Sequence, residues 1–284
     1  MPELPEVETV ARALDARLKG RRVEGVECRF PGVYEAGSGV RPRWPLGILG
    51  ARRRAKLVLL ELDGGLVLVT HLRMTGALKI ESVEAVLEPH THVCIRLDGD
   101  EELRFVDPRR FGRVRLESPA TLAQSSFFTS LGPEPLELDE EGLASRIGVS
   151  RASIKAALLD QRRIAGIGNI YADEILYAAG IHPRQPADTV RPGEWKSLLE
   201  SVRRILNSAI ERGGSTIRDY RSPEGAGSYQ DQHQVFGRTD EPCPACGKRI
   251  RKIRVAGRGT HFCPGCQPQR RRRRRSAPSS RSSR

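Results

Sequence analysis

The first residues of the chain have the composition of a reactive N-terminus. The sequence begins Met1-Pro2-Glu3-Leu4-Pro5, and a proline in second position is small enough for the initiator methionine to be removed. The free secondary amine of Pro2 would then titrate at about 7.7–8.0, in the α-amino range, and be partly uncharged at neutral pH. Such an amine attacks an aldehyde carbon to form an iminium, which withdraws electrons from neighbouring bonds. Glu3 is a candidate general acid or base beside it.

The same residues also have a purely structural interpretation. Pro5 falls in the first turn of a predicted helix, and Glu6 and Glu8 place carboxylates near its N-terminus. Proline and acidic residues are both favoured there, because the first turn has free amides and the positive end of the helix dipole. These residues alone leave both interpretations open.

Most of the cysteines form a metal-binding pattern. Two C-P-x-C pairs are separated by 16 residues: Cys243, Cys246, Cys263 and Cys266. This spacing is typical of a zinc site with four thiolate ligands, which leaves no coordination position for water. The sequence shows no signal peptide and no membrane-length apolar run, so we expect a reducing compartment and zinc rather than disulfides. We predict one structural Zn2+, no catalytic metal and no organic cofactor, with Cys28 and Cys94 as buried small hydrophobic residues.

Between the cysteine pairs the sequence predicts a β-hairpin. Residues 248–255 alternate with a period close to two, and Gly257-Arg258-Gly259 follow as a turn before the return segment Thr260-His261-Phe262. An arginine held at a rigid tip suggests a phosphate contact or a catalytic role. The alternative is an exposed turn arginine without a function.

The net charge favours a polyanionic partner. The chain has 48 Lys and Arg against 35 Asp and Glu, which gives +13. Residues 267–284 hold eight arginines and no acidic residue, so +5 remains for the rest of the chain. Four zinc-bound thiolates would lower this value to about +3. A nucleic-acid site in the folded part must therefore arise from the placement of charge.

The elements that must position these residues change along the chain. Residues 5–19 place Val7, Val10 and Leu14 on one helical face. From 22 to 116 the pattern is that of strands, with hairpin signals at residues 63–65 and 98–100. One helix followed by antiparallel hairpins predicts a β-sandwich with the N-terminus packed against it.

Beyond a linker at residues 131–135 the pattern is helical. Apolar residues recur at helical spacing over 154–164, 170–179 and 195–210, and Gly213-Gly214 end the last helix. Gly166-Ile167-Gly168-Asn169 lie between two of these helices, where backbone amides could approach a phosphate. This signal is weak, because glycine is common in such connections for steric reasons alone. Residues 214–236 are polar and long enough to form a functional loop.

Several segments together carry a family resemblance. They are Pro2–Thr9 (P-E-L-P-E-V-E-T), Arg53–Lys56, His71–Gly76, Asp107–Gly112, Leu131–Leu136, Gly166–Glu174 and the zinc hairpin. Over residues 1–267 the chain resembles the bacterial formamidopyrimidine-DNA glycosylases of the Fpg/Nei family. The resemblance implies an α+β fold with an N-terminal β-sandwich and its helix, a helix–two-turn–helix domain and a C-terminal zinc β-hairpin. The implied domains are 1–130 (catalytic), 131–213 (helix–two-turn–helix), 214–236 (lesion-recognition loop), 237–267 (zinc hairpin) and 268–284 (disordered tail).

The resemblance also implies catalytic roles. Pro2 would attack C1′ of the damaged nucleotide and form a Schiff base with the opened sugar. Glu3 would protonate the sugar oxygen or shuttle protons, and Lys56 would act in base excision. Arg258 would contact the phosphate beside the lesion and assist elimination. The iminium acidifies the C2′ hydrogen, so β- and then δ-elimination would cut the strand on both sides.

A further set of residues would bind DNA or the lesion. Met74, Arg109 and Phe111 match the residues that fill the space left by an extruded nucleotide, although core packing is the alternative for Met74 and Phe111. The candidates for backbone-phosphate contacts are His71, His90, Arg110, Arg151, Lys155 and Asn169. Glu174, Thr216 and Tyr229 are the candidates for recognition of the flipped base.

These observations predict a bifunctional glycosylase and AP lyase of base excision repair that acts on oxidised purines. The expected partner is damaged double-stranded DNA, with no membrane partner, and the expected state is a monomer in the bacterial cytoplasm, associated with the nucleoid through DNA. The alternatives are an endonuclease VIII-like glycosylase for oxidised pyrimidines and a non-catalytic zinc-finger DNA binder. Leu4 and the segment Asp107–Phe111 favour the purine branch.

The tail is where the chain departs from the family pattern. Family members commonly end soon after the last zinc cysteine, whereas 17 residues follow Gln267 here. We expect residues 268–284 to tether DNA without sequence preference, adding about 0.9 to the salt slope per neutralised phosphate. Their deletion without any change in that slope would refute the expectation, and an inert solvated tail is the alternative.

Overall fold

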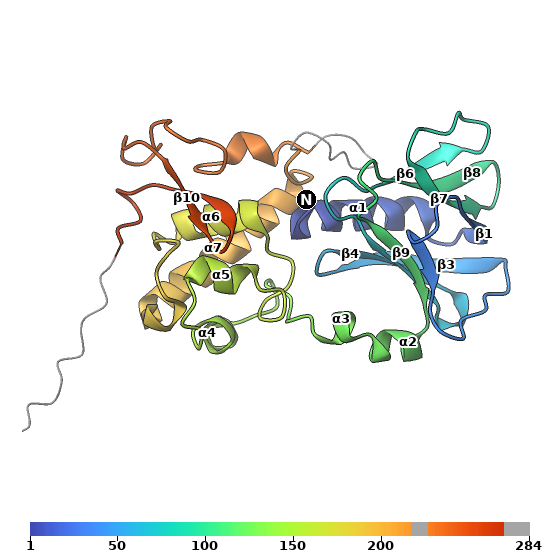
Figure 1. Ribbon diagram of the computed structural model, residues 1–284, viewed down its shortest axis with the longest axis horizontal. Coiled ribbons are helices and arrows are strands. Elements are labelled where there is room, and N and C mark those ends of the chain that lie inside the picture. The colour runs from blue at the N-terminus through green and yellow to red at the C-terminus, as the bar shows by residue number, and fades with distance from the viewer. Residues whose placement is uncertain (217–226, 270–284) are drawn as a thin grey trace, which may run out of the picture.

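The computed structural model of the chain describes residues 1–216 and 227–269. It has one lobe built around strands and one built around helices, and the N-terminus lies where the two meet (Figure 1). The expected recognition loop is described only at its two ends, and the tail from residue 270 onward lies outside the described residues. None of the described helices combines the length and the apolar character needed to cross a bilayer.

Helix α1 (Leu4–Leu18) connects the N-terminus to both lobes. It begins with a capping interaction in which the Glu3 backbone N–H donates to the Glu6 carboxylate at 2.8 Å. Val7, Val10 and Leu14 are buried, as expected for residues that share one helical face. The helix packs against strands β3 (Leu46–Arg54) and β4 (Leu57–Leu62) and against helix α7 (Pro192–Glu211). It therefore holds the N-terminal residues at the junction between the lobes.

The strand lobe is a β-sandwich, as predicted. Strands β2, β9, β5, β4 and β3 form one layer and β1, β7, β8 and β6 the other, with β1 joined to β3 only through Arg22–Gly47 and Val23–Leu46 pairs among the described residues. An apolar core that includes Leu60, Leu68 and Phe105 lies between the layers. The strands are β1 (Arg22–Cys28), β2 (Tyr34–Ala36), β3 (Leu46–Arg54), β4 (Leu57–Leu62), β5 (Val67–His71), β6 (Ala77–Ser82), β7 (Thr91–Leu97), β8 (Glu101–Val106) and β9 (Arg113–Glu117).

The connection between the lobes is anchored by a buried carboxylate. After the short helices α2 (Pro119–Gln124) and α3 (Ser126–Thr129), the chain passes through Glu134, which is 7% exposed. Its carboxylate accepts hydrogen bonds from Arg53 at 2.6 Å, from Arg54 at 2.7 Å and from the Ala55 N–H at 2.7 Å. The predicted linker is thus tied to the end of β3.

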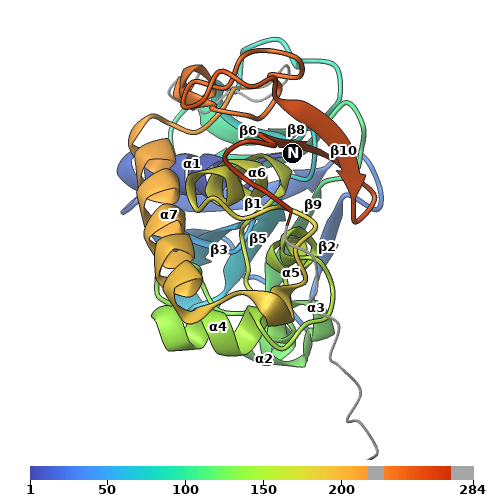
Figure 2. The same ribbon diagram turned by 90° about the vertical axis from the view of Figure 1, so that its left-hand side faces the viewer.

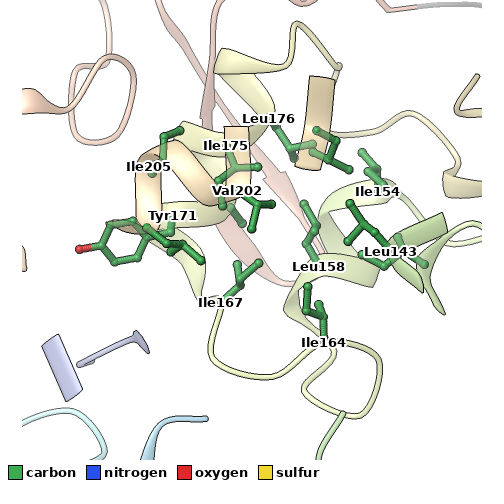
Figure 3. Packing of buried hydrophobic residues seen from close by; sticks show 14 of the residues in the cluster. Leu143, Ile154, Leu158, Ile164, Ile167, Tyr171, Ile175, Leu176, Val202 and Ile205 are labelled. Carbon is green, nitrogen blue, oxygen red and sulfur yellow. The ribbon is translucent and has the colours of Figure 1, made fainter. Parts of the chain in front are cut away.

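The helical lobe packs around a second apolar core (Figure 3). Tyr171 and Ile175 of helix α6 (Asn169–Ala178) and Val202 of helix α7 lie in this core, where the two helices pack together. The zinc hairpin packs on α6, and Figure 2 shows α7 along one edge of this lobe with the hairpin on the other side of α6. The elements are α4 (Glu140–Ile147), α5 (Ile154–Leu159), α6 (Asn169–Ala178), α7 (Pro192–Glu211), β10 (Arg251–Val255) and β11 (Arg258–Phe262), with 3-10 turns at Asp63–Gly65, Ala187–Thr189 and Tyr229–Gln232.

Candidate functional site

The N-terminal residues are fixed by the start of helix α6. The Glu3 carboxylate accepts hydrogen bonds from the backbone N–H groups of Ile170 at 3.0 Å and Tyr171 at 3.4 Å, and the Leu4 N–H donates to the Gly166 carbonyl at 3.0 Å. Pro2 and Glu3 are buried, while Met1 is 47% exposed. The segment that contains the predicted reagent is therefore held between the two lobes, and Met1 remains accessible to removal.

This geometry places a carboxylate beside the segment Gly166–Asn169, where the glycine pattern suggested a phosphate. The free amides of a helix N-terminus attract an anion, but here the anion is the carboxylate of Glu3. Glycine is required for this approach, because a Cβ on Gly168 would lie 2.2 Å from the Glu3 Cδ atom. The glycine pattern marks a close approach, and its partner comes from within the chain.

Lys56 reaches the same connection from the opposite lobe. It follows Ala55, which has a left-handed backbone with φ of +54°, and its Nζ atom donates to the Ile167 carbonyl at 3.0 Å. The Lys56 side chain is 7% exposed. Burial lowers the pKa of Lys56, opposed by the negative charges of Glu3 and Glu6, and the nearby Arg258 guanidinium lowers it further. A lysine in this environment gives up its proton more readily than one in water.

Two buried carboxyl groups share the site with Lys56. Burial raises the pKa of Glu3, while Lys56 and the two α6 amides lower it. Burial raises the pKa of Glu6 to about 7, and the charge of Glu3 adds to this effect. Glu6 accepts hydrogen bonds from the Tyr171 hydroxyl at 2.5 Å and from the Ser215 N–H at 2.7 Å. The site therefore holds two carboxyl groups with raised pKa values beside a lysine with a lowered pKa, an arrangement suited to general acid–base catalysis.

The four predicted zinc ligands come together at the base of the hairpin. Their sulfur atoms all lie within 4.8 Å of one another, and none of them forms a disulfide. Tetrahedral Zn2+ with Zn–S distances of about 2.3 Å places its sulfurs about 3.8 Å apart, and Cys243 and Cys266 are separated by 3.8 Å. The donor set and its size fit a structural zinc ion. Cys94 is buried as predicted, whereas Cys28 is exposed because it ends the strand β1 at the surface.

The hairpin carries Arg258 just after its turn. Ala256 and Gly257 both have positive φ and form the two-residue turn, while Arg258 is the first residue of β11 and pairs with Val255. The Arg258 side chain is exposed. The next residue, Gly259, is held through its carbonyl, which accepts from the Asn169 amide at 3.0 Å.

Lys155 does not lie at the surface, and this corrects its expected role as a phosphate contact. It is 0% exposed, and its Nζ atom donates to Asp173 at 2.6 Å, to the Thr260 hydroxyl at 2.8 Å and to the Gly259 carbonyl at 3.3 Å. The other Asp173 oxygen accepts the His261 N–H at 2.8 Å. Lys155 and Asp173 therefore fasten the hairpin to the helical lobe directly beside Arg258.

Met74, Arg109 and Phe111 form an exposed cluster on the strand lobe. Met74 is 44% exposed and Phe111 50%, so core packing does not explain them. The Arg109 guanidinium contacts the Met74 sulfur at 3.2 Å and lies 4.7 Å from the centre of the Phe111 ring. The structure thus brings together the three residues expected to fill a gap in DNA.

The remaining candidates for phosphate contacts lie around the surface. Arg110 and His90 are exposed and have positive φ, and the Arg110 guanidinium stacks on Phe30 at 4.2 Å. His71 is half-buried, and its Nδ1 atom accepts the Arg73 N–H at 3.0 Å. Burial lowers the pKa of His71 to about 3, so its neutral ring would offer the Nε2 hydrogen. Arg151 is exposed.

Two of the three expected lesion-recognition residues, Glu174 and Tyr229, are buried. The Glu174 carboxylate accepts the N–H groups of Gln234, Val235 and Phe236 at 2.8–3.0 Å. Tyr229 is 5% exposed and packs in the core of the helical lobe. Both residues line one cavity at the base of the expected recognition loop, and their part in lesion recognition stays a prediction.

Thr216 remains a candidate for the lesion. Its backbone N–H donates to Gln230 at 2.9 Å, and its hydroxyl has no hydrogen-bond partner within the part of the chain that the structure describes. It stands next to residues 217–226, the part of the expected loop that lies outside the described residues.

Sequence reasoning missed Glu6, Asp107, Glu134 and Asp173, which hold the site together. Each is an acidic residue within a segment that was recognised for other reasons. Their signal was the presence of a carboxylate in an apolar or proline-rich context, where an unpaired charge would be costly.

Comparison with known proteins assigns each part of the chain. Residues 1–114 match the formamidopyrimidine-DNA glycosylase N-terminal domain, 131–221 match the H2TH domain of the same family, and 240–269 match the zinc finger found in FPG and IleRS. The formamidopyrimidine-DNA glycosylase of Symbiobacterium thermophilum is 46% identical over 94% of this chain and 90% of its own length. The enzyme of the same name from Bacillus subtilis is 40% identical over 94% of this chain and 99% of its own.

Solved structures agree with this assignment. The MutM (Fpg) protein of Thermus thermophilus superposes with a TM-score of 0.85 at 42% identity, over 94% of this chain and 98% of its own. A Lactococcus lactis Fpg variant in complex with a Fapy-dG-containing DNA gives 0.86 at 37% identity, over 94% of this chain and 100% of its own. The same Lactococcus protein with an abasic-site-containing DNA gives 0.86 at 36% identity with the same coverage.

Proposed function

The chain belongs to the formamidopyrimidine-DNA glycosylase family, and on that premise we propose that it excises oxidised purines, 8-oxoguanine and formamidopyrimidines, from double-stranded DNA and then cleaves the strand as an AP lyase. One observation carries the proposal. The N-terminal Pro2-Glu3 is held against the start of α6, Glu3 interacts electrostatically with Lys56, and Lys56 in turn interacts with Arg258.

Pro2 is the nucleophile in this proposal. Once Met1 has been removed, its secondary amine attacks C1′, the damaged base departs with the electrons of the glycosidic bond, and the sugar ring opens. Glu3 is placed to protonate the ring oxygen as a general acid, because burial raises its pKa above the ordinary value. Lys56, with its lowered pKa, is suited to proton transfer on the base or sugar.

The iminium then drives strand cleavage. Its positive charge acidifies the C2′ hydrogen, so removal of that proton expels the 3′ phosphate, and a second elimination expels the 5′ phosphate. Arg258 is exposed at the hairpin and rigidly held by its neighbours. We assign it to the phosphate whose negative charge grows as the bond breaks.

Access to C1′ requires the nucleotide to leave the base stack. Extrusion costs a few kcal/mol, and side chains that fill the vacated space offset part of that cost. Met74 and Phe111 supply apolar surface, and Arg109 supplies hydrogen-bond donors for the orphaned base. The zinc ion supplies no chemistry of its own when bound, because four cysteines fill its coordination. Its role is to hold the hairpin that carries Arg258.

We further propose that the enzyme acts as a monomer on chromosomal DNA in the bacterial cytoplasm. The basic balance of the chain supports a nucleic-acid partner. Solved relatives bound to damaged DNA support the same class of partner.

The test is reductive trapping followed by mapping of the cross-linked residue. Protein from which Met1 has been removed is mixed with a duplex containing 8-oxoguanine opposite cytosine and reduced with borohydride. We expect a covalent adduct on the peptide that begins with Pro2, and no adduct from protein that retains Met1. An adduct on another peptide would contradict the role of Pro2. Faster excision of thymine glycol than of 8-oxoguanine would indicate the oxidised-pyrimidine activity instead.

A further inference from the structure

Asp107 lies beneath the exposed cluster of Met74, Arg109 and Phe111. It directly follows strand β8 and is 0% exposed. Its Oδ1 atom accepts hydrogen bonds from the Thr75 hydroxyl and from the Arg109 N–H at 3.2 Å. Its Oδ2 atom accepts the Gly112 N–H at 2.7 Å. One buried carboxylate thus joins the loop that carries Met74 to the loop that carries Arg109 and Phe111.

The backbone of Asp107 extends the connection to a third surface loop. Its N–H donates to the His90 carbonyl at 3.0 Å, and its carbonyl accepts the Arg110 N–H at 3.1 Å. The Nε2 atom of His92 lies 2.9 Å from the same carbonyl. The loop that contains His90, the loop of Met74 and the loop of Arg109 and Phe111 are therefore all hydrogen-bonded to Asp107.

Backbone strain gathers in these three loops. Arg73, His90 and Arg110 all have positive φ, of +56°, +71° and +58°. Left-handed conformations of non-glycine residues persist only where the surroundings impose them, and they are frequent at functional sites. Asp107 is hydrogen-bonded to the backbone of two of these residues, His90 and Arg110.

The two loops of the cluster also lie against one ring. A Cβ atom on Gly76 would approach Phe105 to 2.9 Å, and one on Gly112 would approach it to 2.4 Å. The loops are therefore seated on the sandwich core at fixed positions, with Met74, Arg109 and Phe111 directed outward. Contacts with the core hold these two loops in place, while the apolar side chains of Met74 and Phe111 stay exposed.

We propose that Asp107 is a positioning residue that couples the Met74 loop to the Arg109 loop, so that both enter the damaged duplex as one preformed wedge. The inference rests on the proposed function, because a wedge is useful only if a nucleotide is extruded. Preformed loops lose less conformational entropy on binding than independent loops. The Thr75–Asp107 hydrogen bond is the part of the coupling that can be removed while Asp107 keeps its Arg109 and Gly112 N–H donors.

The experiment removes that hydrogen bond and preserves shape. Thr75→Val replaces the hydroxyl by a methyl group, and Thr75→Ser is the matched control that keeps the hydroxyl. Single-turnover rates are measured on an 8-oxoguanine duplex and on a single-stranded DNA with an abasic site, which has neither an orphaned base nor a stack to enter. Wild-type activity on both substrates establishes the proposed function separately.

We expect Thr75→Val to slow excision from the duplex about ten- to a hundredfold, the range for loss of a hydrogen bond to a charged group. Cleavage of the single-stranded abasic substrate should stay within about twofold of wild type, and Thr75→Ser should match wild type on both. Equal rates for Thr75→Val and wild type on the duplex would overturn the proposal. An equal loss on both substrates would also overturn it, because it would show a general structural role. Asp107→Asn, measured in the same way, must show the same selective loss on the duplex.

Discussion

The buried pair of Lys155 and Asp173 offers the sharpest test of how the site is built. Both side chains are 0% exposed, and the Nζ to Oδ1 distance is 2.6 Å. Burial lowers the pKa of Lys155, and the charge of Asp173 opposes that shift. Because the pair holds residues 259–261 beside Arg258, its loss should affect both stability and catalysis.

The magnitude follows from the cost of an unpaired buried charge. Lys155→Met leaves the Asp173 carboxylate with contacts to the hairpin only through His261, by its backbone N–H and its ring Nδ1. Removing one partner of a buried pair costs about 3–5 kcal/mol. Asp173→Asn should cost a similar amount. The double variant should lose less than the sum of the two, because no charge then remains buried.

Urea unfolding and the salt dependence of DNA binding separate this role from a phosphate contact. Arg151→Met is the matched control, because Arg151 is basic, exposed and close in sequence. We expect Lys155→Met to lower the unfolding free energy without altering the salt slope of binding by folded protein. Arg151→Met should leave stability unchanged and, if Arg151 contacts a phosphate, reduce the slope by about 0.9. A Lys155→Met protein that unfolds at the wild-type urea midpoint and shows the reduced slope would refute the structural role.

Three further predictions concern the same site. Glu6→Gln should flatten the pH dependence of the unfolding free energy between about pH 4.5 and 7. Burial raises the pKa of Glu6 to about 7 in the folded state. Its protonated form therefore contributes stability fully below the unfolded pKa of about 4.3, and that contribution is lost as the pH rises through 7. Urea titrations at a series of pH values measure this, and an unchanged slope in the variant would contradict the raised pKa. Zinc removal by a chelator, or Cys246→Ser, should abolish strand cleavage because the hairpin that carries Arg258 loses its structure. Mass spectrometry measures the metal content. Strand cleavage that survives complete loss of zinc would show that Arg258 does not need the zinc site. Glu134→Gln should slow base excision at least about tenfold. A neutral amide cannot accept hydrogen bonds from Arg53, Arg54 and the Ala55 N–H as the carboxylate does, so the segment that precedes Lys56 would lose its anchor. Wild-type excision kinetics in the variant would exclude that role.

The sequence predicted most of the architecture, because its signals are local. Helical spacing located α1 and α7, glycine turns located the β4–β5 and β7–β8 hairpins, and cysteine spacing identified the zinc site. Each of these patterns depends on neighbours within about 20 residues. The α+β fold follows from them and from the family resemblance.

The burial of single charged residues could not be predicted in the same way. Lys155 is paired with a residue 18 positions away and with the hairpin more than 100 positions away, and Glu174 is bound by amides 60 positions away. A basic residue in a DNA-binding protein is expected at the surface, since a lone buried charge is unfavourable. Only the three-dimensional structure shows that Lys155 has buried hydrogen-bond partners and that its charge holds the hairpin to the helical lobe.

The start of α6 shows how a correct physical signal can have its partner within the chain. The glycines of Gly166–Asn169 suggested amides that attract an anion, and the amides of the next two residues, Ile170 and Tyr171, bind Glu3 from the first residues of the chain. The same amides that would have bound a phosphate instead lower the pKa of Glu3 against the effect of burial. Because Gly166 also accepts the Leu4 N–H, one short turn fixes both the position of the N-terminus and the proton affinity of the acid beside it. A Gly168→Ala substitution would place a Cβ atom 2.2 Å from the Glu3 Cδ atom. It should therefore impair base excision by displacing Glu3, not by removing a contact with DNA.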